Sequence, residues 1–280
     1  MTEAASADLA HSNKHYARGL ARAFAGAILF GFPLLMTMEM WWFGFYLDRS
    51  RLFLFLLVTL AMLVPLSYFV GFERTGTLLE DAIDSIVAFA VGMVASSLML
   101  FVFGAIGPGM SADEIVGKIA VQTVPASIGA ILARGQMGGE GSDSKEKQER
   151  AGYAGKLFIA AAGAVFLAFN VAPTEEIILI GFMMSPLQAI ALVLLSIAVL
   201  YGFVYALNFR GGDELPDDVA RPVAVVRHSV AEYGVALLVS AYVLWTFGRT
   251  DGASAWQIAM MVTVLGFPAA LGAATARLVL

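Results

Sequence analysis

Apolar residues run through this chain in long segments and not in alternation with polar ones. A helix needs about 20 mainly apolar residues to cross a hydrocarbon layer of about 30 Å. Eight segments meet this requirement, and the two-residue period of a membrane β-strand is absent. Their cores are residues 20–38, 52–71, 83–105, 115–133, 154–172, 186–207, 229–248 and 256–276. The pattern predicts an all-α, polytopic membrane protein with eight transmembrane helices.

Polar residues gather in two places outside these segments. Residues 1–19 precede a long aromatic span without an Ala-x-Ala cleavage pattern, so we predict a cytoplasmic tail and not a signal peptide. Residues 135–152 are charged and rich in Gly and Ser, which is typical of a flexible linker. The predicted organisation is a four-helix repeat over 20–134 and a second over 153–280, joined by this cytoplasmic linker.

Composition agrees with a bilayer environment, because 59% of the residues are hydrophobic and only 14% are charged. The net charge of −5 and the scattered basic residues argue against nucleic-acid binding. The chain has no cysteine and three histidines, so we expect no metal site and no other cofactor. Phosphate-binding loops and the common hydrolase motifs are also absent, so the sequence gives no support for an enzyme.

The orientation follows from lysine and arginine, which concentrate in cytoplasmic loops. With eight spans both termini lie on one side, and thirteen of the 17 basic residues lie there too. The opposite side holds only Arg49, Arg51, Lys118 and Arg249. We therefore predict cytoplasmic termini.

The two groups of four spans resemble each other in sequence. Shifting the chain by 137 residues aligns Gly26–Tyr68 with Gly163–Tyr205, and 11 of 43 positions are identical. The last span of each group ends in Pro-Ala-x-x-Gly-Ala-x-x-Ala-Arg, at 125–134 and 268–277. Independent packing of small residues would give some likeness, but it does not require the matched Pro and Arg. An even number of spans per copy makes this a tandem 4+4 parallel repeat.

Both copies contain the pattern Thr-x-Glu-x-x-x-x-Gly-Phe, which begins at Thr37 and at Thr174. The apolar segments 40–47 and 177–184 that follow are too short to cross a membrane. We therefore predict a short re-entrant or interfacial helix in each copy, with its acidic residue near the start. Two interpretations of the acidic residues stay open. Glu39, Glu175 and Glu176 either surround a cation-attracting vestibule, or they complement helix dipoles at the outer surface after a Thr174 N-cap.

Other polar residues inside or beside the spans are candidates for a pathway. Glu232 lies one helical turn after His228 and is the strongest candidate for an inner proton site. Asn170 and Gln122 either line a polar path or make interhelical hydrogen bonds. Thr37 and Thr174 belong to the repeated pattern and are also candidates to line the pathway. Asp81 and Asp84 are at the start of the third span, where acidic residues are ordinary partners of the helix dipole.

The segments GFPLLMTMEMWWFG (31–44) and FNVAPTEEIILIGF (169–182) carry a resemblance to a known family. In these segments the chain resembles a family of uncharacterised bacterial multi-span integral membrane proteins, and the likeness covers essentially the whole chain. The resemblance implies a location in the bacterial inner membrane and a small companion protein encoded nearby. It transfers no functional residue. The family is usually described with seven spans, whereas charge and repeat predict eight here.

The leading hypothesis is a transporter or channel for a small cation or a proton-coupled solute, with its pathway between the two repeats. Glu39, Glu175, Glu176 and Glu232 are its predicted cation or proton sites. The alternative is a membrane scaffold or accessory subunit that holds a partner protein and transports nothing. The expected partners are the lipid bilayer, the companion protein and further copies of the chain in a homo-oligomer.

Overall fold

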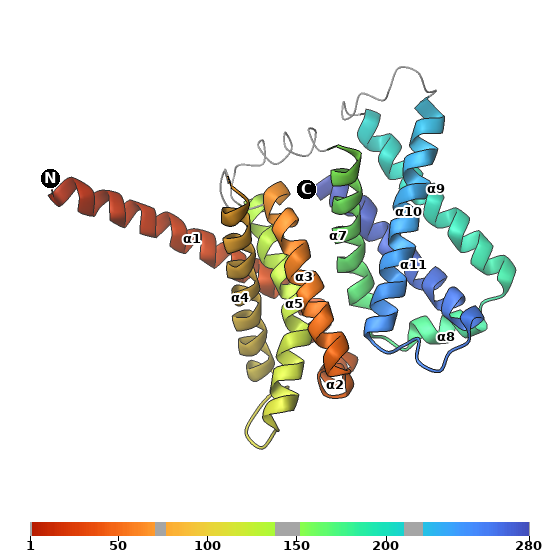
Figure 1. Ribbon diagram of the computed structural model, residues 1–280, viewed down its shortest axis with the longest axis horizontal. Coiled ribbons are helices and arrows are strands. Elements are labelled where there is room, and N and C mark those ends of the chain that lie inside the picture. The colour runs from red at the N-terminus through yellow and green to blue at the C-terminus, as the bar shows by residue number, and fades with distance from the viewer. Residues whose placement is uncertain (1, 71–76, 138–151, 210–220, 280) are drawn as a thin grey trace. The chain divides into compact units, whose positions relative to one another are not determined.

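The computed structural model describes residues 2–70, 77–137, 152–209 and 221–279. These residues form ten helices joined by turns and loops (Figure 1). The helices are α1 Thr2–Leu35, α2 Met38–Tyr46, α3 Arg49–Val70, α4 Leu78–Val102, α5 Ala112–Met137, α7 Tyr153–Val171, α8 Glu176–Met183, α9 Pro186–Phe209, α10 Arg221–Thr246 and α11 Ala255–Val279. Most of the predicted linker 135–152 lies outside the described residues.

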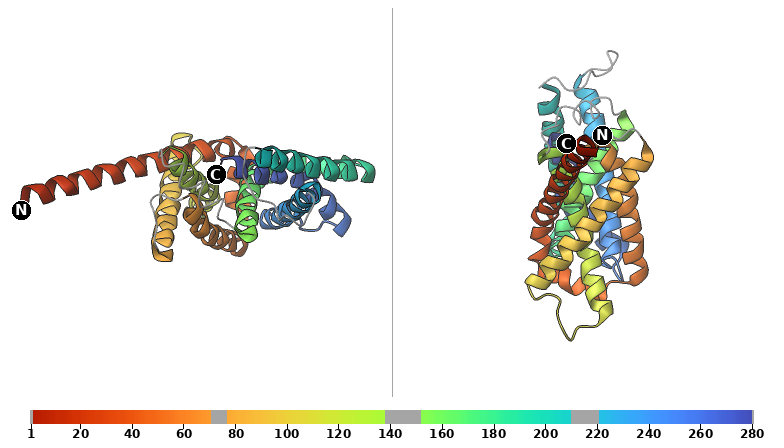
Figure 2. Two further views of the ribbon diagram at one scale, coloured as in Figure 1. Left: turned by 90° about the horizontal axis from the view of Figure 1, so that it is seen from above. Right: turned by 90° about the vertical axis from the view of Figure 1, so that its left-hand side faces the viewer.

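Eight of these helices are long and apolar enough to cross a membrane, which confirms the predicted number of spans. The other two, α2 and α8, are the short helices expected after the Thr-x-Glu patterns. The predicted tail is helical from Thr2 onward and continues into the first span as one helix, α1 (Figure 2). The segment of α1 that is apolar enough to cross is Tyr16–Leu35.

The chain divides into two units, and the first comprises Met1–Tyr46 and Phe53–Ser144. Helix α5 is its centre, because α1, α2 and α4 all pack on it. Residues 121–133 of α5 are all buried. This stretch consists mostly of small and β-branched residues, which allow neighbouring helices to approach closely.

Glycine sets the closest approach in this first unit. A Cβ atom built on Gly26 of α1 would overlap Ala133 and lie 2.5 Å from the carbonyl oxygen of Gly129, both on α5. A Cβ on Gly92 of α4 would lie 2.7 Å from the backbone nitrogen of Ser127. The backbones of α1 and α4 therefore touch α5 directly, and the contact requires glycine at these positions.

The second unit comprises Leu47–Leu52 and Lys145–Leu280. Helix α11 is its centre, and α7, α8, α9 and α10 pack on it. Gly163 of α7 and Gly272 of α11 meet backbone to backbone, since a Cβ on either would overlap the carbonyl oxygen of the other. Four helix pairings of the first unit, α1 with α5, α2 with α5, α4 with α5 and α1 with α4, have counterparts in the second unit, which are α7 with α11, α8 with α11, α10 with α11 and α7 with α10.

Large apolar side chains remain exposed along the length of several helices. On α4 they include Ile83, Ile86, Met93 and Leu98, which are between 45% and 58% exposed. Helix α9 is the least buried span, with 17% of its apolar segment inside the structure. Such continuous exposed apolar surface is unfavourable in water and is the expected lipid-facing surface of a membrane protein.

Candidate functional site

The repeated threonines close the joints between the long and short helices. The Thr37 hydroxyl donates to the carbonyl oxygen of Leu34 at 2.8 Å, and the Thr174 hydroxyl donates to Val171 at the same distance. Each carbonyl lies near the end of a long helix and also accepts the backbone amide of the same threonine, at 3.0 Å for Leu34 and 3.1 Å for Val171, so the threonine closes the helix end with two bonds. The structure therefore gives both threonines a local structural role, and the suggested N-cap role of Thr174 is wrong because Glu175 occupies the N-cap of α8.

The repeated glycines allow the short helices to lie on the central helices. A Cβ on Gly44 of α2 would lie 2.5 Å from the Cα atom of Lys118 on α5. A Cβ on Gly181 of α8 would lie 3.1 Å from the side chain of Met261 on α11. Hydrogen bonding thus explains the Thr of the shared pattern and packing explains its Gly, whereas its Glu and its exposed Phe, at Phe45 and Phe182, are left for another role.

The acidic residues of the pattern lie in the first turns of the short helices. Glu39 is half-buried in α2, while Glu175 and Glu176 are exposed at the start of α8. Acidic residues in a first turn complement the positive end of the helix dipole. This placement suits the dipole interpretation, and the role of these carboxylates in a vestibule stays a prediction.

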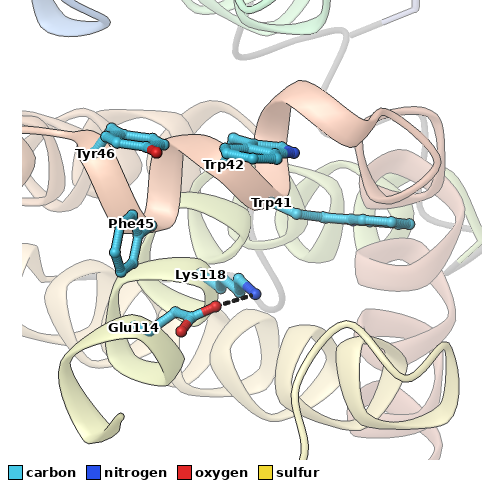
Figure 3. Close-up of a pocket in the computed structure, with 6 residues that line it drawn as sticks. All are labelled: Trp41, Trp42, Phe45, Tyr46, Glu114 and Lys118. Atoms are coloured by element: carbon cyan, nitrogen blue, oxygen red, sulfur yellow. Dashed lines mark ion pairs between the residues drawn. The ribbon is translucent and has the colours of Figure 1, made fainter. Parts of the chain in front are cut away.

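An open depression with a volume of about 380 Å³ lies beside α2 in the first unit (Figure 3). Its walls are Trp41, Trp42, Phe45, Tyr46, Glu114 and Lys118. The Lys118 ammonium group is 2.7 Å from Glu114 Oε1 and donates to the carbonyl oxygen of Ala105 at 3.0 Å. Lys118 is only 9% exposed, so these partners compensate a nearly buried positive charge.

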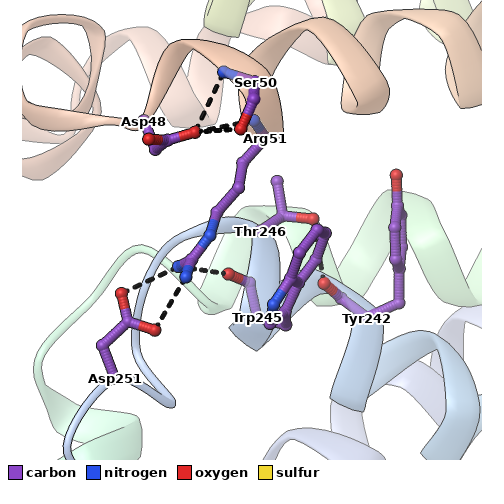
Figure 4. Close-up of polar contacts among 7 residues, drawn as sticks. All are labelled: Asp48, Ser50, Arg51, Tyr242, Trp245, Thr246 and Asp251. Atoms are coloured by element: carbon purple, nitrogen blue, oxygen red, sulfur yellow. Dashed lines mark hydrogen bonds and ion pairs between the residues drawn. The ribbon is translucent and has the colours of Figure 1, made fainter.

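A second polar cluster lies in the second unit around Arg51 (Figure 4). Its guanidinium group makes two hydrogen bonds to the carboxylate of Asp251, of 2.8 and 2.9 Å. It also donates to the carbonyl oxygen of Trp245 at 3.1 Å and lies 5.1 Å from the centre of the Trp245 ring. This two-point geometry fixes the loop between α10 and α11 onto the segment that begins α3.

Asp48 caps the start of α3 in the same cluster. Its carboxylate accepts hydrogen bonds from the Ser50 hydroxyl and from the backbone nitrogens of Ser50 and Arg51. The Ser50 hydroxyl and the Arg51 amide, in that order, lower the pKa of Asp48 below its ordinary value of 3.8. A capping carboxylate of this kind satisfies amide groups that the helix cannot.

Three of the four basic residues predicted on the far side of the membrane bind backbone carbonyls. Lys118 binds Ala105 beyond the end of α4, Arg51 binds Trp245 near the end of α10, and Arg249 donates to Pro173 beyond α7. Cations at the carboxyl ends of helices are favoured by the helix dipole and by unpaired carbonyls. The positions of these three residues beside helix ends therefore have a local structural cause.

Glu232 lies on the buried face of α10, inside the span His228–Thr246, and is 1% exposed. Ser229, three residues earlier, is fully buried on the same face. His228 is half-buried, and its ring meets that of Tyr153 edge-on at 5.2 Å. A buried carboxyl within a membrane span is costly, which makes Glu232 a site that needs a functional or structural explanation.

The two amide residues proposed for a pathway make helix contacts. The Gln122 amide nitrogen donates to the carbonyl oxygen of Gly31 at 2.8 Å and so connects α5 to α1. The Asn170 amide nitrogen donates to Phe166 at 2.7 Å within its own helix. The Gln122 bond is interhelical, as the structural interpretation expects, whereas the Asn170 bond is not, and Asn170 Oδ1 is buried without a hydrogen-bond partner among the described residues. Throughout the described segments, no three His, Cys, Asp or Glu residues are grouped so that they could hold a metal ion.

The apolar spans and their lipid-facing surfaces define a multi-pass integral membrane protein. The chain belongs to the family described as "Putative integral membrane protein (DUF2391)", whose model matches residues 19–280. This confirms the resemblance found in the sequence. Searches of curated proteins and of solved structures found no match.

Sequence reasoning missed the Arg51 cluster and the Lys118 pair. The partners Arg51 and Asp251 are 200 residues apart, and no local pattern connects them. The Ser-x-x-Gln patterns at 185–188 and 254–257 did carry a readable signal. In both, the serine amide donates to the glutamine side chain at 2.8 Å, as in a capping box that begins a helix.

Proposed function

We propose that this protein transports a small cation or a proton-coupled solute across a membrane. The observation that supports the proposal most strongly is Glu232, a carboxyl group with 1% exposure inside a span. Acidic residues at such positions are expensive in hydrocarbon, and in membrane proteins they mark ion or proton pathways. Half-buried His228 lies one turn away on the same helix and is a suitable proton partner.

We further propose that the two units are copies of one ancestral four-helix unit. Beyond the sequence identities, both copies place glycine at equivalent contacts, Gly26 with Gly129 and Gly163 with Gly272. Both also end their third long helix on a glycine with positive φ, 70° at Gly104 and 69° at Gly248. Equivalent packing and equivalent helix ends support a duplication more strongly than shared small residues do.

In this proposal the protein lies in a bacterial inner membrane with cytoplasmic termini. Glu39, Glu175 and Glu176 serve as outer carboxylates, and Glu232 as the inner site. These carboxylates lie at the starts of the short helices and outside the spans, and such positions suit an entry that collects cations from water. The outer carboxylates and Glu232 are proposed as separate binding sites, and separate variants test them.

The test is flux in liposomes that contain the purified protein and a pH-sensitive dye. We expect Glu232→Gln to lower flux at least tenfold, because the amide cannot release a proton. Glu39→Gln and Glu176→Gln should each lower the flux less, since carboxylates outside the spans act by attracting ions. Asp113→Asn removes an exposed carboxylate outside the proposed sites and is the matched control. Unchanged flux in Glu232→Gln would overturn the proposal.

The second candidate function is a membrane scaffold or accessory subunit for a companion protein. The open depression beside α2 favours it, because Trp42, Phe45 and Tyr46 each remain more than half exposed there. Aromatic side chains are common anchors at protein interfaces. This function predicts that a second protein co-purifies in constant ratio, that Trp42→Ala releases it, and that the purified chain alone shows no flux.

A further inference from the structure

Helix α4 buries an acidic side chain near its start. Asp81 is 2% exposed and lies inside the span Leu78–Val102. Its Oδ1 atom is buried and, among the described residues, has no hydrogen-bond partner. A buried carboxylate oxygen without a partner is costly, so its presence requires a compensating group that the described residues do not supply.

Capping does not explain this burial. The N-cap of α4 is Thr77, whose hydroxyl accepts a hydrogen bond from the Glu80 amide at 3.4 Å. Glu80 is exposed in the first turn and already complements the helix dipole from the water side. Asp81 therefore has no necessary part in starting the helix, and its inward position needs another cause.

The same face of α4 carries further polar atoms. Ser85 and Ser96 follow Asp81 on this face and are 0% and 1% exposed. The Ser85 hydroxyl donates to the Asp81 carbonyl at 2.7 Å, whereas the Ser96 hydroxyl oxygen is buried without a partner among the described residues. Between them Gly92 lies against Ser127 of α5, so this polar face is turned toward the central helix. Two unsatisfied buried oxygens on one face indicate that water or a proton reaches the contact between α4 and α5.

We propose that Asp81 is a proton-binding carboxyl group of the first unit, in addition to the proton site proposed at Glu232 in the second unit. A bound proton supplies the donor that the orphan oxygen lacks and removes the cost of a buried charge. Among the described side chains, charged residues on the elements packed at this end include Arg22 on α1, and Glu80 and Asp84 on α4 itself. In the alignment of the two copies, Glu232 matches Ala88, two turns from Asp81 on the same face. The role of Asp81 in transport rests on the proposed function, but proton binding does not.

Chemical labelling of the wild-type protein in liposomes tests this directly. Dicyclohexylcarbodiimide is apolar and reacts with protonated carboxyl groups, whereas a water-soluble carbodiimide with glycine ethyl ester modifies carboxyl groups in contact with water. Peptide mass spectrometry then compares Asp81 with its exposed neighbour Glu80. We expect the apolar reagent to label Asp81 at least five times more than Glu80, and the soluble reagent to show the reverse. Asp81→Asn confirms the assignment of the labelled peptide.

Either absence of apolar labelling at Asp81 or labelling of both residues alike by the soluble reagent would overturn the inference. The outcome is independent of flux. If Glu232→Gln abolishes flux while Asp81 stays unlabelled, the proposed function stands and this inference fails. If Asp81 is labelled while no flux is found, the inference stands and the transport proposal fails.

Discussion

The contact between α7 and α11 should tolerate no side chain at Gly163. In Gly163→Ala the new Cβ would overlap the carbonyl oxygen of Gly272 and lie 2.5 Å from the Cβ of Ala276, whereas ordinary contact begins at 3.4 Å. The helices must therefore separate by roughly 1 Å. Overpacking of this kind costs about 1–3 kcal/mol. Alanine recovers about 0.5–1 kcal/mol of this through its greater helix preference.

The net loss is then at most about 2.5 kcal/mol, with a central value of about 1 kcal/mol, which corresponds to a melting temperature about 2–4 °C lower. Tryptophan fluorescence during heating measures this melting temperature, since the chain has four tryptophans. No thiol-reactive dye is suitable, because the chain has no cysteine. The matched control is Gly234→Ala on α10, where a Cβ would meet nothing within 4 Å. That variant should melt at or slightly above the wild-type temperature. Equal melting of both variants would show that the close crossing of α7 and α11 is absent.

Three further predictions use the same melting assay. Arg51→Ala should lower the melting temperature by less than Gly163→Ala, and most of its effect should vanish when Asp251 is already alanine, because the two side chains share their bonds. Asp48→Asn should make the stability less dependent on acid pH. Because the pKa of Asp48 is lowered in the folded state, the Asp48 carboxylate stabilises the fold fully above the ordinary value of 3.8, and this stabilisation is lost as the pH falls through the folded-state pKa. Gln122→Leu should cost about 1 kcal/mol, since it removes the 2.8 Å bond to a buried carbonyl.

Each of these predictions has a result that contradicts it. Additive effects of Arg51→Ala and Asp251→Ala would mean that the bidentate pair does not form. A wild-type melting curve with the same acid dependence as Asp48→Asn would refute the cap. For Gln122, the control is Gln257→Leu, whose side chain lies at the start of α11 and bonds only within its own first turn among the described contacts. A larger loss at Gln257 would contradict an interhelical role for Gln122.

The shared Thr-x-Glu pattern shows how far sequence reasoning reached. Its repetition drew attention to two carboxylates, yet the structure explains its Thr by the bonds to Leu34 and Val171 and its Gly by contact with a central helix. A repeated residue is repeated for packing as readily as for chemistry. Glu232, which was chosen for its depth in a span and for His228 one turn earlier, is more deeply buried than Glu39, Glu175 and Glu176.

The sequence by itself determined the spans and the short helices between them. Lipid imposes a minimum apolar length and forces each backbone polar group to find its partner locally, so both features are written in contiguous residues. Only the tertiary structure decided which polar and charged groups have hydrogen-bond or ion-pair partners. The pairing of Arg51 with Asp251, the carbonyl partner of Lys118 and the inward turn of Asp81 depend on helices that are distant in sequence meeting at particular faces. Such contacts follow from packing between helices, which no periodicity within one helix encodes.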